Sequence, residues 1–145
     1  MARSKITSAS KDLLTDNGAV LASIIDGEQV HLEVTLNWLI NLTDYTLKAN
    51  VVEALNLGDG KIPLVVRPAG QVTTLTILDP VVTDNTFKIV FPEELITTWT
   101  VQPTPEYPVY GYLELEVRDP GVGSAKQIWK PIRGLVQVLY SPTEV

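Results

Sequence analysis

Hydrophobic and polar residues alternate along much of this chain of 145 residues. In the clearest run, residues 30–38, polar residues occupy one face and the other face carries Val30, Leu32, Val34, Leu36 and Trp38. Successive side chains of a β-strand point to opposite faces, so this period of two predicts a strand with one buried face. Residues 45–51 and 112–117 repeat the pattern. Shorter runs rich in β-branched residues, at 62–67, 72–78 and 86–91, predict further strands.

Turn-forming residues separate these runs. Asp and Asn bond to their own backbone, and Gly tolerates positive φ angles, so both residue types favour turns. They occur here as Asn17-Gly18, Asp26-Gly27, Gly58-Asp59-Gly60, Pro68-Ala69-Gly70, Thr83-Asp84-Asn85 and Asp119-Pro120-Gly121. Strands at this spacing predict an all-β antiparallel sandwich or barrel. We expect residues 28–145 to form one β-sandwich domain, and residues 1–27 to form an N-terminal arm and a first strand.

Two places depart from simple alternation. Pro92–Trp99 begins with a proline followed by two glutamates, which favours one short helix of one or two turns. Pro131 interrupts the last apolar run, residues 128–140, with Gly134 close by. Proline cannot donate a hydrogen bond to a neighbouring strand, so Pro131 predicts a sheet edge or a bulge.

Composition narrows the classes of function. The net charge is −6, and lysines and arginines are scattered, so nucleic acid and anionic membranes are not expected partners. The longest apolar stretches, such as residues 19–25, are too short to cross a bilayer. The chain has no cysteine, which excludes disulfides, thiolate metal sites and cysteine nucleophiles.

Catalytic chemistry has few candidates. His31 is the only histidine, and it lies on the polar face of a predicted strand. The aspartates fall at turns, without the spacing of a calcium loop. We therefore expect no catalytic residue, no metal site, no cofactor and no enzymatic activity.

Interface residues are easier to nominate. Trp129 and Arg133 flank Pro131 at the suspected edge, and Trp and Arg are enriched at the energetic centres of interfaces. Burial of Trp129 in the core is the alternative. In the N-terminal arm the few apolar side chains are Ile6, Leu13 and Leu14. An arm that orders on a neighbouring subunit would use these residues as its contacts.

Four stretches resemble a known family. They are "DYTLKANVVEA" (Asp44–Ala54), "TFKIVFPEELITTW" (Thr86–Trp99), "GYLELEVRDPGVG" (Gly111–Gly123) and "IRGLVQVLYSPTEV" (Ile132–Val145). In this order they resemble the small immunoglobulin-like β-sandwich proteins of tailed bacteriophages, including the N-terminal module of phage baseplate upper proteins. The pattern has Asp44 where the family usually has glycine, and the first 27 residues have no counterpart in it.

The resemblance implies a non-enzymatic structural protein of the virion, made in the cytoplasm of the host bacterium. It implies docking in the tail, baseplate or fibre-attachment region, in several copies per particle, on other virion proteins. A capsid decoration or cement protein is the alternative within the same class. A carbohydrate-binding module that uses exposed aromatic residues is a further alternative.

Overall fold

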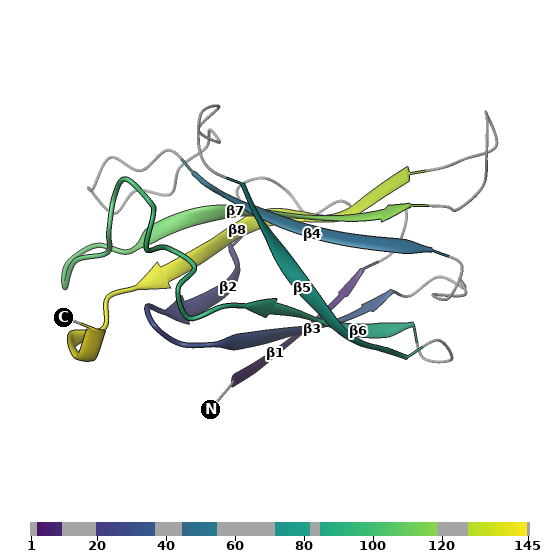
Figure 1. Cartoon of the computed structure of the whole chain (residues 1–145), viewed down its shortest axis with the longest axis horizontal. Coiled ribbons are helices and arrows are strands. Elements are labelled where there is room, and N and C mark those ends of the chain that lie inside the picture. Colours follow the sequence, from purple (N-terminus) through teal and green to yellow (C-terminus); the bar gives the residue numbers. More distant parts are fainter. Residues whose placement is uncertain are drawn as a thin grey trace.

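Among the residues that the structure describes, eight β-strands make up nearly all of the regular structure. The computed structural model describes residues 3–9, 20–36, 45–54, 72–81, 85–118 and 128–144. The strands are β1 (Arg3–Ala9), β2 (Val20–Ile25), β3 (Val30–Leu36), β4 (Thr46–Glu53), β5 (Val72–Val81), β6 (Thr86–Phe91), β7 (Val109–Arg118) and β8 (Ile128–Leu139). They form one sheet in the order β1-β3-β6-β5-β4-β7-β8-β2 (Figure 1). The predicted all-β class is confirmed.

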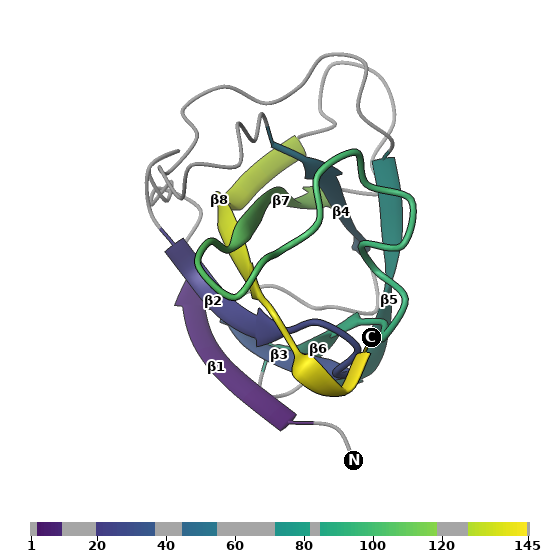
Figure 2. The same cartoon turned by 90° about the vertical axis from the view of Figure 1, so that its left-hand side faces the viewer.

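The sheet curls into a near-barrel because β5 belongs to both of its halves. Residues Val72–Leu75 pair with β4, whereas β5 pairs with β6 from Thr76 onward. Strands that change partners in this way form the corners between packed layers. Viewed end on, the strands surround a common interior (Figure 2).

The other corner is a tight turn between β2 and β3. The N–H of Glu28 donates to the carbonyl of Ile25 at 2.9 Å, and Gly27 has a φ of 84°, a left-handed conformation that favours glycine. β2 and β3 are not neighbours in the sheet. This turn therefore carries the chain from one end of the strand order to the other half.

The expectation of antiparallel pairing holds for five of the seven strand pairs. The two exceptions lie at the ends of the sheet, where β1 runs parallel to β3 and β2 runs parallel to β8. The order within each half is that of an immunoglobulin sandwich, but the shared β5 joins the halves. The immunoglobulin-like assignment therefore stays a prediction.

The interior is filled by the alternating residues that the pattern predicted. On β3 and β7 every second residue is buried, with Val30, Leu32, Val34, Leu113, Leu115 and Val117 exposed by 1% or less. Both halves of the sheet contribute to one continuous apolar cluster. Trp38 and the strand predicted at 62–67 lie outside the described residues.

Residues 92–99 form hydrogen-bonded turns in place of the expected short helix. Each bond spans three residues: Leu95 N–H to Pro92, Thr97 N–H to Glu94, and Trp99 N–H to Ile96, at 3.0–3.2 Å. Leu95, Ile96 and Trp99 are buried, so the segment caps one end of the core. The described residues contain one regular helix, a 3₁₀ turn at Pro142–Glu144.

Pro131 lies in a bulge, as predicted. Leu115 pairs with Ile132, but Val117 pairs with Trp129, so β8 carries one extra residue between these two pairs. A bulge accommodates a residue that cannot donate to the ladder. From Leu135 onward the opposite side of β8 is covered by β2, so this part of β8 is not the edge that we expected.

The N-terminal segment also differs in part from an unpaired arm. Residues 3–9 form β1, which lies at the end of the sheet alongside β3. Residues 10–19, which include Leu13 and Leu14, lie outside the described residues.

Candidate docking surface and pocket

The bulge places the two β8 candidates on opposite faces of the sheet. Trp129 is half-buried at the rim of the core, and its ring centroid lies 5.8 Å from that of Tyr45. Arg133 faces outward, with Nε 3.4 Å from the Glu114 carboxylate. Ile6 lies in β1 opposite Glu33. The structure does not gather these residues into one surface, and their interface roles stay predictions.

Exposed apolar side chains gather at the end of the near-barrel where β8 finishes. Ile25 and Leu139 are directly paired between β2 and β8, and they are exposed by 39% and 38%. Tyr107, exposed by 39%, lines a shallow depression together with Leu139 and Tyr140. We name Ile25, Tyr107 and Leu139 the Tyr107 patch. Pro142, the first residue of the 3₁₀ turn, lines the same depression.

A proline-rich turn presents Tyr107. Thr104 and Tyr107 exchange two backbone hydrogen bonds, of 2.9 and 3.2 Å, around Pro105 and Glu106. The Thr104 hydroxyl also accepts the Tyr107 N–H, at 3.0 Å. Because the ring of Pro105 restricts its φ angle, this turn holds Tyr107 in place before any partner binds.

The surroundings of the patch are acidic. Glu106 lies in the wall of the depression, the Asp26 N–H donates to the carbonyl of Leu139, and Glu28 accepts a long bond from the Ile25 N–H. No lysine or arginine occurs among the described residues that line the depression. An apolar surface with an acidic rim complements a partner that presents apolar and basic side chains.

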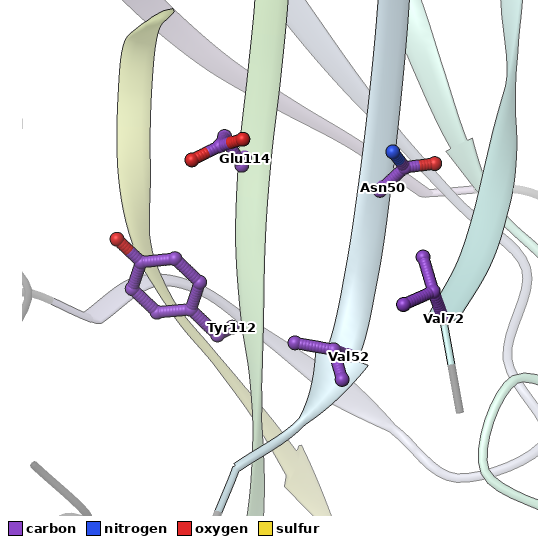
Figure 3. A pocket seen from close by; sticks show the side chains of 5 residues that line it. All are labelled: Asn50, Val52, Val72, Tyr112 and Glu114. Atoms are coloured by element: carbon purple, nitrogen blue, oxygen red, sulfur yellow. The ribbon is translucent and has the colours of Figure 1, made fainter. Parts of the chain in front are cut away.

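A second depression lies on the outer face of β4, β5 and β7, with a volume of about 260 Å³. Figure 3 shows the side chains that line it: Asn50, Val52, Val72, Tyr112 and Glu114. They form two rows across the strands. Asn50 is opposite Glu114 in the first row, and Val52 is opposite both Tyr112 and Val72 in the second.

Two groups in the polar row are able to bind a ligand. The Asn50 side-chain oxygen accepts the Thr74 hydroxyl at 2.8 Å, and within the described structure its NH₂ group makes no hydrogen bond. The Glu114 carboxylate forms long ion pairs with Lys130 and Arg133, both at 3.4 Å. Each carboxylate oxygen can accept more than one hydrogen bond, so Glu114 keeps capacity to accept others.

His31 and the acidic side chains were the residues with metal-ligating chemistry in the sequence. In the part of the chain that the structure describes, no three His, Asp or Glu side chains lie close enough to hold a metal ion. His31 is on the outer face of β3, opposite Val90. No helix among the described residues has the length and apolarity needed to cross a membrane.

Comparison with known proteins supports the fold. No protein-family model matches the sequence, and no curated protein matches it. Among solved structures, the N-terminal domain of phage TP901-1 ORF48 is similar, with a TM-score of 0.50 and 9% sequence identity. The likeness covers 96% of this chain and 99% of that domain. At this identity it concerns the architecture alone.

Sequence reasoning missed the Tyr107 patch and the pocket. The patch joins β2, β8 and a loop, and the pocket joins β4, β5 and β7, so each depends on strand register. It also missed Glu53, a carboxylate exposed by only 3% that accepts the N–H groups of Thr100 and Val101. The only available signal was its place in the inward series after Ala49 and Val51.

Proposed function

We propose that this protein is a non-enzymatic structural protein of a tailed-phage virion, and that it docks in the tail, baseplate or fibre-attachment region. The Tyr107 patch is the observation that carries the proposal. It exposes large apolar side chains on a rigid scaffold, which is typical of a surface that binds another protein.

Two further observations support a phage particle as the assembly to which this protein belongs. Four stretches of the sequence resemble phage β-sandwich proteins, and the fold is similar to a phage protein domain over nearly the full length of both chains. The docking partner is another virion protein, whose contact surface presents apolar residues flanked by lysine or arginine. A capsid decoration role uses the same surface and is the alternative location.

The location test uses purified particles of a phage that encodes this chain. A fused tag is detected by gold labelling, and cryo-electron microscopy locates the added density. Density at the tail tip or baseplate supports the proposal, and density on the capsid supports the alternative. Absence of the chain from particles refutes both.

The surface test uses a double variant, Tyr107→Ser with Leu139→Ser. Loss of the apolar contacts should lower incorporation into particles at least about tenfold, a change of about 1.4 kcal/mol in binding. The matched control is Val72→Ser, because Val72 is an exposed apolar residue, at 63%, outside the patch. Equal incorporation of the two variants would show that the Tyr107 patch does not dock the protein.

A further inference from the structure

We propose that the outer-face pocket of β4, β5 and β7 binds a neutral saccharide, with Asn50 and Glu114 holding hydroxyl groups and Tyr112 contacting the sugar ring. This inference goes beyond the structural role, since neither activity requires the other.

The register supplies the geometry. Residues directly opposite each other in an antiparallel pair have Cβ atoms about 4.5–5.5 Å apart. Asn50 and Glu114 are such a pair, as are Val52 and Tyr112 in the adjacent row. A polar row and an apolar row therefore lie side by side on one face (Figure 3).

The polar row suits a hydroxyl group. A hydroxyl both donates and accepts, so it is best bound where an acceptor and a donor lie together. The Glu114 carboxylate is the acceptor, and the Asn50 NH₂ group, which has no acceptor within the described structure, is the donor. Hydrogen bonds to a charged acceptor are the stronger kind, so Glu114 favours a ligand rich in O–H donors.

The apolar row suits the other side of the same ligand. A sugar ring has C–H groups as well as hydroxyls, and these C–H groups pack against aromatic and aliphatic side chains. Tyr112 is half-buried, which fixes its ring, and Val72 is exposed by 63% at the far side of the pocket. An entirely apolar ligand would leave the polar row desolvated and unpaired, which disfavours it.

Charge selects a neutral ligand. The Glu114 carboxylate forms one end of the polar row and would repel an acidic sugar. Lys130 and Arg133 compensate for part of that charge. A strongly cationic ligand would have to compete with these two side chains, so a neutral sugar fits best.

The experiment screens the full chain against immobilised neutral oligosaccharides of glucose, galactose, N-acetylglucosamine and rhamnose. The best-binding sugar is then titrated while backbone amide NMR shifts are followed. Saturable binding is expected, with the largest shifts at residues 50–52, 72–74 and 112–114. Tyr112→Ala and Asn50→Ala should each weaken binding about tenfold, and Tyr112→Phe should retain most of it because the ring remains.

Tyr107→Ala is the matched control, since Tyr107 is an exposed tyrosine in the other depression. Melting temperatures of all variants confirm that they remain folded. The inference is overturned if no neutral sugar binds, if binding is unchanged in Asn50→Ala and Tyr112→Ala, or if the sugar shifts amides elsewhere and not these. Particle incorporation is measured separately, so failure here leaves the structural role standing.

Discussion

The outer faces of the two halves of the sheet, β3–β6 and β4–β7, differ in how many hydrogen-bonding groups of their side chains remain unused. On the β3–β6 face, cross-strand partners satisfy one another: Thr35 and Thr86 share a hydroxyl contact of 3.2 Å, and Glu33 is opposite Lys88. On the β4–β7 face, Asn50 is opposite Glu114, and donor and acceptor capacity remains.

This difference indicates that a binding site in such a sheet is to be expected where outward side chains keep unused hydrogen-bonding groups. Both halves bury alternate residues in one core, so burial does not distinguish them. What distinguishes them is whether the outward residues of neighbouring strands complement each other in hydrogen bonding and charge. Substitutions in the shared core, and then in the β4–β7–β8 half, test this comparison from the largest expected effect to the smallest.

The largest effect is expected from a charge placed in the shared core. Leu115→Asp in β7 and Leu32→Asp in β3 each bury an unpaired carboxylate at a site exposed by 1% or less. Each substitution should lower the free energy of unfolding of the protein by at least about 4 kcal/mol and prevent folding at 37 °C. Circular dichroism and solubility measure this. If one half tolerates its aspartate, the halves do not share a cooperative core.

The next effect concerns Glu53, at the end of β4. Glu53→Ala leaves the N–H groups of Thr100 and Val101 without the acceptor that they have at 3.0 and 3.2 Å. Unfolding in denaturant should show a loss of about 1–3 kcal/mol. Glu53→Gln keeps an oxygen acceptor and should lose less. Equal losses in the two variants would indicate that the charge, and not the hydrogen bonding, is what matters.

Gly111 in β7 should tolerate no larger residue without adjustment of Trp99. A Cβ at this position would lie 2.5 Å from the Trp99 ring atom Cη2 and 3.0 Å from Val51 Cγ2. Gly111→Ala should cost about 1–3 kcal/mol through overpacking and shift the tryptophan fluorescence. Trp99→Phe in the same chain should recover part of the loss, giving a favourable coupling in a double-mutant cycle. Additive losses would mean that Trp99 is not the obstacle.

The smallest change in stability is expected for Trp129→Ala. The ring is half-buried and contacts Tyr45, so its loss should cost about 1–2 kcal/mol. If Trp129 is an interface residue, incorporation into particles should fall by more than this loss of stability explains. A loss of about 3–5 kcal/mol with proportionate incorporation would identify it as an ordinary core residue.

Alternation is sufficient to predict β3 and the 112–117 part of β7, because both bury every second residue there and the period of two has no helical equivalent. The β-branched residues of 86–91 predict β6, and Pro131, which cannot donate to a ladder, predicts an edge or a bulge, of which the structure has the bulge. Alternation does not predict β1, whose sequence is mostly polar and which is recognisable only by its pairing with β3.

The residues that line the outer-face pocket could not be predicted from the sequence, for a different reason. Asn50 and Glu114 become neighbours only through the register of β4 on β7, and register depends on the whole sheet. Proline and glutamate at 92–94 predict a short helix, because both favour helix starts. The structure has successive turns instead, closed by hydrogen bonds over three residues and held by the burial of Leu95, Ile96 and Trp99.

The position of β2 beside β8 has a consequence for the order in which the molecule folds. Ser23 and Gln137 are hydrogen-bonded across 114 positions of sequence, so β2 has no partner in the sheet until β8 has been synthesised. Contacts of such long sequence separation are slow to form. We therefore expect nascent chains that stop before β8 to keep β2 unpaired and prone to aggregation, and the near-barrel to close only after β8 has left the ribosome.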